Sequence, residues 1–120
     1  MSFLKQIRPL LYTAQMRETV DFYTRVLGFR LAAAQEDGSW AAVARDGIEF
    51  GISPPNAHIP FTAAVFTGSF YITVDDVDAL WQEWRDLARI CYPLEDFPYG
   101  MREFALYDNN GYLLQFGQEL

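Results

Sequence analysis

The sequence predicts an α+β fold in which two βαβββ modules form a curved, partly open mixed sheet around a cleft. The main observation is an internal repeat: residues 13–53 and residues 74–118 each begin with an amphipathic helix and continue as short apolar strands. Both halves also carry a similar turn signal, Asp-Gly at 46–47 and Asp-Asn-Asn-Gly at 108–111. A functional site is therefore expected between the two modules.

Length and composition indicate how the chain is organised. A chain of 120 residues has the size of a single domain. We expect one domain over 1–120, with a first repeat at about 5–53, a joint at 54–67 and a second repeat at about 68–118. No apolar run reaches the ~18 residues of a membrane helix, and the first residues do not resemble a signal peptide. A cytoplasmic protein is therefore expected.

Charge and aromatic content indicate the kind of partner. The net charge of −7 argues against nucleic acid, because phosphate binding needs a basic surface. This charge permits a cationic ligand, although solubility is the simpler explanation for it. Aromatic residues make up 17% of the chain, which suits a site for flat or cationic organic molecules.

Local signals predict the elements of the first module. A strand is followed by a helix that stops at Gly28. Three more strands follow, and Asp46-Gly47 joins the last two as a hairpin. The expected ranges are 7–12, 16–27, 31–35, 40–45 and 48–53.

The second module follows a proline-rich joint. Its helix is expected to start at an Asp cap, Asp75 or Asp76. The segment 61–67 is compatible with a strand or with the connecting loop, and 96–100 is expected to be a loop. The expected strands are 69–74, 90–92, 102–107 and 112–117, with the helix ending at about residue 88.

Strand alternation assigns every second side chain to the cleft. In the strand 48–53, Phe50 and Ile52 face the core, so Glu49 faces the cleft. The same rule gives a cleft of mixed aromatic and polar character. It is lined by Tyr12, Glu49, Tyr71, Ser69 and Gln115, while Ile7, Pro9, Leu11, Leu114 and Phe116 point inward.

The repeat, the helix end at 22–29 and the turn at 108–112 together resemble the vicinal oxygen chelate superfamily, which includes glyoxalase I, extradiol dioxygenases and bleomycin resistance proteins. Three further features resemble the bleomycin resistance branch: Pro9 in the first strand, the helix pattern at 80–84, and the stretch 98–106 that contains Arg102-Glu103-Phe104. The resemblance implies a homodimer whose first strands cross at Pro9. It also implies clefts at the dimer interface that sequester a cationic aromatic antibiotic.

Enzymes of that superfamily hold a divalent metal with one ligand from each of four strands. The resemblance places these ligands at Arg8, Gly51, Ser69 and Gln115. Arginine cannot bind a metal, glycine has no side chain, and Ser and Gln are weak donors. We therefore expect no metal and no other cofactor.

Other catalytic arrangements are also not expected. The single histidine, His58, lies in the joint, so no Ser or Cys has a His partner. Cys91 is expected to be a buried small hydrophobe. The acidic run at 75–78 fits helix capping, and Arg102 and Glu103 fit a structural ion pair across strands.

Two functions follow from these patterns. The first is a metal-free, dimeric binding protein for a small cationic or aromatic compound, of the bleomycin type. The second is a glyoxalase-like or dioxygenase-like enzyme that acts on a small metabolite or thiol conjugate, using either Glu49 or an adventitious metal. A third possibility is a cleft closed by its own side chains, which leaves the dimer as a structural module. Trp40 fits a groove or the core equally well. The expected ligand-binding residues are Trp40, Tyr99, Glu49, Tyr71, Tyr12, Gln115, Ser69 and Glu36.

Overall fold

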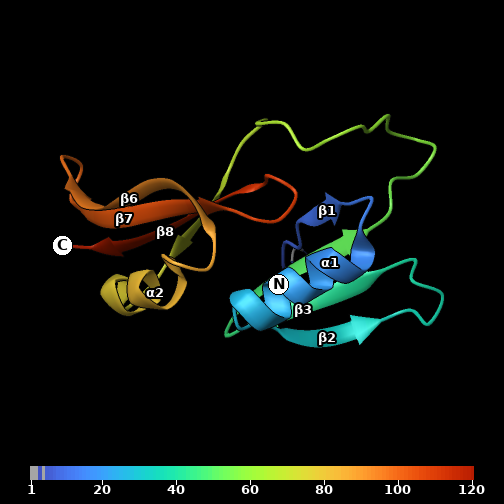
Figure 1. Cartoon of the computed structure of the whole chain (residues 1–120), viewed down its shortest axis with the longest axis horizontal. Helices are drawn as coiled ribbons and strands as arrows, with labels where there is room; N and C mark the ends of the chain where they lie inside the picture. Colours follow the sequence, from blue (N-terminus) through green and yellow to red (C-terminus); the bar gives the residue numbers. More distant parts are fainter. Residues whose placement is uncertain (1–2, 4) are drawn as a thin grey trace. The chain divides into compact units, whose positions relative to one another are not determined.

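The computed structural model describes Phe3 and residues 5–120. It divides into two compact units, Met1–Thr62 and Ala63–Leu120, which we call the first and second modules. Each module holds a four-stranded mixed sheet with a helical segment against one face, and the order of elements is the same in both (Figure 1). The predicted α+β fold of two βαβββ modules is confirmed.

The first module begins with β1 and a helical segment and ends with an antiparallel meander. Its sheet order is β1-β4-β3-β2, with β1 parallel to β4. As the sequence predicts, Gly28 at φ 77° ends the helical segment and Asp46 at φ 53° turns the β3–β4 hairpin. The elements are β1 (Leu10–Tyr12), α1 (Met16–Asp21), the π-helix η1 (Phe22–Val26), β2 (Arg30–Ala34), β3 (Ala41–Arg45) and β4 (Ile48–Ser53).

The second module repeats this plan. Its sheet order is β5-β8-β7-β6, with β5 parallel to β8. Asp76 caps the helix, because its carboxylate accepts a hydrogen bond from the Ala79 N–H at 3.1 Å. The elements are β5 (Phe70–Thr73), α2 (Val77–Trp84), β6 (Arg89–Phe97), β7 (Met101–Tyr107) and β8 (Leu113–Glu119).

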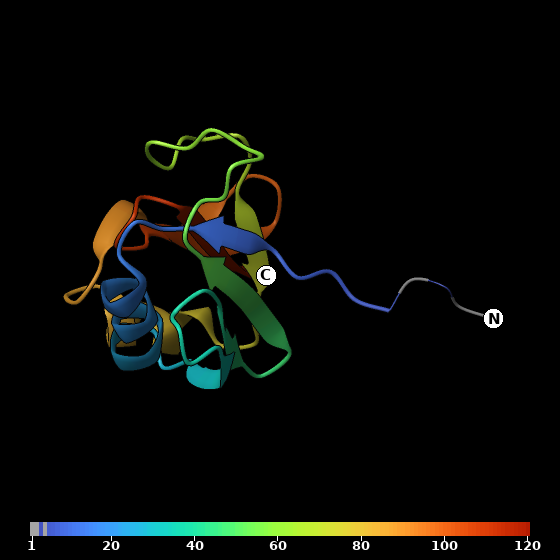
Figure 2. The ribbon, with the colours of Figure 1, turned by 90° about the vertical axis from the view of Figure 1, so that its right-hand side faces the viewer.

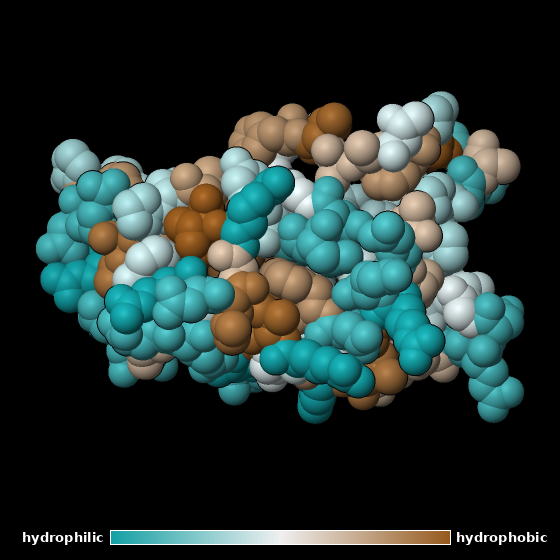
Figure 3. Space-filling view, in the orientation of Figure 1, coloured by the Kyte–Doolittle hydropathy of each residue, from teal (hydrophilic) through white to brown (hydrophobic). Residues whose placement is uncertain are grey.

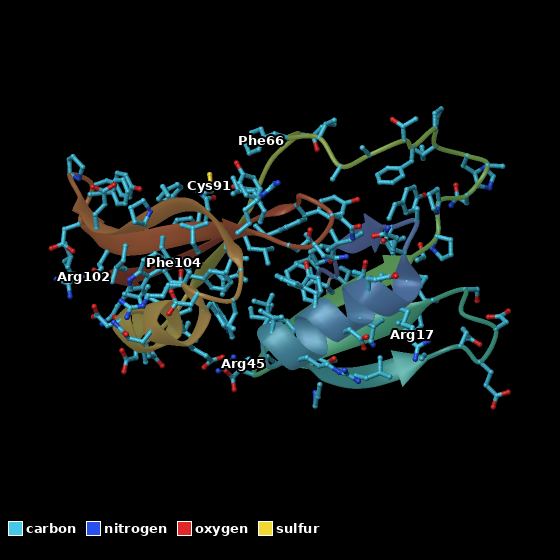
Figure 4. All side chains as sticks on the ribbon, viewed as in Figure 1. Arg17, Arg45, Phe66, Cys91, Arg102 and Phe104 are labelled. Atoms are coloured by element: carbon cyan, nitrogen blue, oxygen red, sulfur yellow. The ribbon has the colours of Figure 1, made fainter. Side chains whose placement is uncertain are left out.

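Aromatic side chains fill both cores. In the first module the buried Tyr23 ring lies 5.6 Å from Phe29 and 5.7 Å from Phe50. In the second module Trp84 of α2 lies 6.3 Å from Phe104 of β7, and Figure 4 shows Phe104 on the side of β7 that faces α2. Each buried ring stabilises its module by about 1.5–3 kcal/mol. The helix-covered faces therefore form the cores.

The first strand is shorter than predicted. It begins at Leu10, and Ile7 is 89% exposed, so the inward placement of Ile7 is wrong. Pairing with β4 starts only where the Pro9 carbonyl accepts a hydrogen bond from the Gly51 N–H at 2.8 Å. Before that point the chain runs away from the sheet (Figure 2). Leu11 is buried as predicted.

β6 is longer than predicted. It continues through Pro93 to Phe97, so part of the predicted loop at 96–100 is strand. Proline lacks an N–H donor, but β6 is an edge strand whose register shifts on both sides of Tyr92, and such strands tolerate proline. Cys91 was expected to be buried and is instead exposed (Figure 4), because an edge strand is covered on fewer sides than a central one.

The helices are also shorter than predicted, and the segment 61–67, for which the sequence allowed a strand or a loop, is a loop. The predicted helix 16–27 changes from α to π geometry after Asp21, and α2 ends at Trp84 rather than near residue 88. The segment 61–67 forms no strand. Its Val65 and Phe66 are exposed, and Figure 3 shows apolar side chains along the joint between the modules. Within the described residues, every helix is too short or too polar to span a membrane.

Candidate functional site

Arg8, Trp40 and Glu49 form a cluster in the first module, on the sheet face opposite the core. The Arg8 Nε donates a hydrogen bond to Glu49 Oε2, and the guanidinium lies 5.9 Å from the centre of the Trp40 ring. Gly51 leaves room for this cluster, because an added Cβ would lie 3.3 Å from Trp40 Nε1 and 3.6 Å from Arg8 Cδ. The carboxylate and the ring are therefore both engaged by a cation of the chain itself.

The other two predicted residues of the first module lie outside this cluster. Tyr12 packs edge-on against Phe61, with ring centres 5.6 Å apart. Glu36 is exposed in the turn before β3. Its neighbour Asp37 accepts hydrogen bonds from Ser39, which lower the pKa of Asp37, so this acidic turn is stabilised locally.

A buried carboxylate, Glu103 of β7, is the centre of the site in the second module. Only 1% of Glu103 is exposed. Tyr71 of β5 donates a hydrogen bond to its Oε1 at 2.8 Å, and Tyr92 of β6 donates to its Oε2. The Tyr99 hydroxyl, from the loop between β6 and β7, also donates to this carboxylate. Three hydroxyl donors from three elements thus hold one buried anion.

These hydrogen bonds shift the pKa of all four groups. Burial raises the pKa of Glu103, but the three hydroxyl donors together lower it more, so the pKa lies below its ordinary value of 4.5. Burial, followed by the bond to Glu103, raises the pKa of Tyr71 and of Tyr92 well above 10.0. For Tyr99 the bond to Glu103 is the main cause, and its pKa rises to about 12. At neutral pH the carboxylate is charged and the tyrosines are protonated.

Gly117 of β8 makes the Tyr71 bond possible. The sheet register places Gly117 directly opposite Glu103. A Cβ added at Gly117 would lie 2.0 Å from Tyr71 Oη and 2.7 Å from its Cζ, well inside van der Waals contact. The tyrosine ring therefore lies directly over Gly117 and reaches the carboxylate only because this residue has no side chain.

Gln115 and Ser69 extend the network beyond Tyr92. Gln115 Nε2 donates a hydrogen bond to Tyr92 Oη at 2.9 Å, and Ser69 Oγ donates to Gln115 Oε1. Four residues that the sequence analysis proposed separately are thus joined through Glu103 and Tyr92. They are Tyr71, Tyr99, Ser69 and Gln115.

The positions that correspond to the superfamily's metal ligands hold no set of metal donors. Arg8 and Gly51 do lie together in the first module, and Ser69 and Gln115 are hydrogen-bonded in the second. A guanidinium, a glycine, a neutral hydroxyl and an amide make a poor site for a divalent ion. Within residue 3 and residues 5–120, no three His, Cys, Asp or Glu side chains come together to hold a metal. These residues do not fit the superfamily's metal.

The roles of Glu103 and Tyr92 were not predicted from the sequence. The expected pairing of Glu103 with Arg102 is wrong, because Arg102 binds Asp96 at 2.6 Å and Asp78 of α2 at 3.2 Å. Neighbouring residues of a strand point to opposite faces, so Arg102 and Glu103 cannot share a side of β7. This alternation was available in the sequence and would have placed Glu103 on the face opposite Phe104.

Comparisons with known proteins agree with this architecture. Residues 5–116 match the family model described as Glyoxalase/Bleomycin resistance protein/Dioxygenase superfamily. No curated protein matches the sequence. Many solved structures match the fold, and three of them illustrate its range.

The bleomycin-binding protein from bleomycin-producing Streptomyces verticillus, solved as a complex with copper(II)-bleomycin, is 28% identical over 97% of both chains, with a TM-score of 0.73. TioX from Micromonospora sp. ML1 is 25% identical over 96% of this chain and 100% of its own, with a TM-score of 0.75. A lactoylglutathione lyase from Agrobacterium tumefaciens, 20% identical over 98% and 96% of the two chains, shares the fold with a TM-score of 0.73. With its paired βαβββ modules and a family match that spans residues 5–116, the chain belongs to the Glyoxalase/Bleomycin resistance protein/Dioxygenase superfamily.

Proposed function

We propose that this chain is a metal-free binding protein that sequesters a small cationic aromatic compound, of the bleomycin type. The observation that carries the proposal concerns the positions at which the superfamily's enzymes hold their metal ligands. Arg8 is paired with Glu49, and Ser69 is paired with Gln115, so these side chains bind each other instead of presenting metal donors. The second module meanwhile offers aromatic rings around a carboxylate, which is suitable chemistry for a cation.

Tyr99 is the best candidate for direct contact with the ligand. Its ring stacks on Phe97, with centres 5.5 Å apart and planes 14° apart, and the residue is 62% exposed. A ring that is supported on one face and open to solvent can stack an aromatic ligand at little entropic cost. Trp40 is less suitable, because the Arg8 guanidinium already lies over its ring.

The similarity to the bleomycin-binding protein supports the choice of probe. That protein was solved with copper(II)-bleomycin and is 28% identical to this chain. Bleomycin carries both flat aromatic rings and positive charge, which matches an acidic chain rich in aromatic residues. The alternative, an enzyme that uses Glu49 as acid or base, is less well supported because Glu49 is engaged by Arg8.

We further propose that the protein is a homodimer. The segment before β1 leaves its own sheet at Pro9, and Ile7 and Leu10 are both largely exposed. Exposed apolar residues at this edge of the sheet favour burial of the edge against a second copy. Light scattering coupled to gel filtration tests the proposal: a mass near 13.8 kDa at micromolar concentration contradicts it.

The direct test is a calorimetric titration of chelator-treated protein with metal-free bleomycin. We expect saturable binding that Tyr99→Ala weakens by about tenfold, since stacking on one ring is worth about 1–1.5 kcal/mol. Leu87→Ala is the matched control, because Leu87 is similarly exposed but lies in the turn after α2. Absence of binding, or equal binding by both variants, contradicts the proposal.

A further inference from the structure

The hydrogen bonds that link Ser69, Gln115, Tyr92 and Glu103 form a hydrogen-bond chain in which every donor points toward Glu103. The Glu103 carboxylate is ionised, so it can only accept. Tyr92 must therefore donate to it, which leaves the Tyr92 oxygen to accept from the Gln115 amide NH₂. This orients the Gln115 carbonyl oxygen toward Ser69, which must donate in turn.

The direction of this hydrogen-bond chain determines whether Ser69, at its outer end, donates or accepts a further hydrogen bond. The hydroxyl hydrogen of Ser69 is used by Gln115, so the Ser69 oxygen offers only lone pairs to anything beside it. Ser69 is half-buried and lies just before β5. A buried anion at the inner end thus makes the outer end a hydrogen-bond acceptor.

The first module shows what the same position can hold. Leu10 pairs with Gly51 in the β1–β4 register, as Tyr71 pairs with Gln115 in the β5–β8 register. Arg8 and Ser69 lie two residues before Leu10 and Tyr71, ahead of β1 and β5, and therefore occupy equivalent positions. At this position the first module has the cation Arg8, which pairs with Glu49, whereas the second module has Ser69, whose oxygen is a hydrogen-bond acceptor. Among residue 3 and residues 5–120, no side-chain cation bonds to Glu103.

We propose that Ser69 is a specificity-determining residue that binds a hydrogen-bond donor of the ligand, above all a protonated amine, and that Glu103 positions it through Gln115 and Tyr92. The inference deepens the binding function proposed above and names the group that the second module selects. A ligand carboxylate or phosphate would place lone pairs against lone pairs and is rejected.

The experiment uses two probes of similar shape and opposite charge, tryptamine and indole-3-propionate. Each is titrated into ¹⁵N-labelled full-length protein while the side-chain NH₂ signal of Gln115 is followed by NMR. We expect tryptamine to shift this signal and to bind about tenfold more tightly than indole-3-propionate, as a hydrogen bond to a charged group allows. Ser69→Ala should remove most of this preference.

Glu103→Gln tests the direction of the chain. A glutamine can donate, so each bond can reverse until Ser69 donates outward. We expect the preference for tryptamine to fall below about threefold or to invert in favour of indole-3-propionate. Glu95→Gln is the matched control, because Glu95 lies opposite Glu103 in the β6–β7 register and the variant loses the same charge, while Glu95 makes none of the hydrogen bonds that link Ser69 to Glu103. It should keep the preference of the unmodified protein.

Three results overturn the inference: no shift of the Gln115 signal with either probe, equal affinity for both probes, or the same loss of preference in Glu95→Gln as in Glu103→Gln. Far-ultraviolet circular dichroism confirms that each variant is folded, and Ser69→Ala remains decisive if Glu103→Gln does not fold. The bleomycin titration is independent. If bleomycin fails to bind while tryptamine is preferred, the proposed function is wrong and this inference stands.

Discussion

The two modules have the same strand order, but they fill equivalent positions with opposite chemistry. Ile52 follows Gly51 and pairs with Ala41, as Phe116 follows Gln115 and pairs with Phe104. The residues just before Ala41 and Phe104 are Trp40 and Glu103, which are therefore equivalent. The first module thus has Arg8, Gly51 and Trp40 where the second has Ser69, Gln115 and Glu103.

This difference shows that the same backbone can hold a carboxylate whose charge is neutralised by a cation or one whose charge is not neutralised. In the first module Arg8 balances Glu49 within the chain. In the second module, among the residues that the structure describes, the donors to the buried carboxylate are all neutral: Tyr71, Tyr92 and Tyr99. Neutral donors stabilise an anion without cancelling its charge, so the second module retains a negative potential that can act on a ligand.

The largest expected contrast comes from removing the two carboxylates. Glu103→Ala leaves the hydroxyls of Tyr71, Tyr92 and Tyr99 without their shared acceptor and should lower the free energy of unfolding by about 2–4 kcal/mol. Glu49→Ala removes a partly exposed ion pair and should cost less than about 1 kcal/mol. Urea unfolding followed by circular dichroism measures both values, and equal losses would contradict the contrast.

The second contrast concerns two glycines, Gly117 beneath Tyr71 in the second module and Gly51 beneath Arg8 and Trp40 in the first. Gly117→Ala forces Tyr71 off Glu103 and should cost about 1–3 kcal/mol, as overpacking does. Gly51→Ala meets the Leu10 side chain at 3.1 Å and other flexible atoms farther away, so it should cost less. In a Tyr71→Ala background the cost of Gly117→Ala should largely disappear. An unchanged cost there would show that Tyr71 is not the obstacle.

A third test uses acid. The pKa of Glu103 is lower in the folded protein than its ordinary value of 4.5. The stability from this group is therefore complete above about pH 4.5 and is lost as the pH falls through the lower folded-state pKa. Urea midpoints between about pH 2 and pH 6 should fall less steeply in Glu103→Gln than in the unmodified protein. Parallel curves would contradict this prediction.

A fourth test uses base. The folded-state pKa of Tyr99 is about 12 and those of Tyr71 and Tyr92 are raised further, against an ordinary 10.0. Their stabilisation is complete below about pH 10 and is lost as the pH rises through the raised values. Ultraviolet absorbance of tyrosinate should show delayed ionisation of these tyrosines, and Glu103→Gln should shift this ionisation toward lower pH. An unshifted titration would argue against the hydroxyl bonds.

The smallest expected effect is that of Arg8→Gln in the first module. Arg8 is partly exposed, as is Glu49, so the loss should be about 0.5 kcal/mol and should shrink further at high salt. Differential scanning calorimetry at low and high salt measures it. A loss as large as that of Glu103→Ala would mean that the first module depends on its ion pair as strongly as the second depends on its buried carboxylate.

The sequence by itself determined the elements whose signals are local. The Gly28 stop, the Asp46-Gly47 turn and the Asp76 cap each act within a few residues, and the inward faces of β4 and β8 follow from alternation alone. These features were predicted because backbone sterics, capping and side-chain periodicity act over short distances. Element ends were less predictable, as the extension of β6 through Pro93 illustrates.

The site was decided only by the tertiary structure. Ser69 and Gln115 could be proposed from the sequence, but nothing local indicates that Glu103 is buried or that Tyr92 connects it to Gln115. Tyr71 reaches Glu103 from 32 residues away, across a space that Gly117 leaves empty. Whether a carboxylate is exposed or enclosed depends on side chains that the sheet brings together from distant strands, and that register is a property of the folded chain.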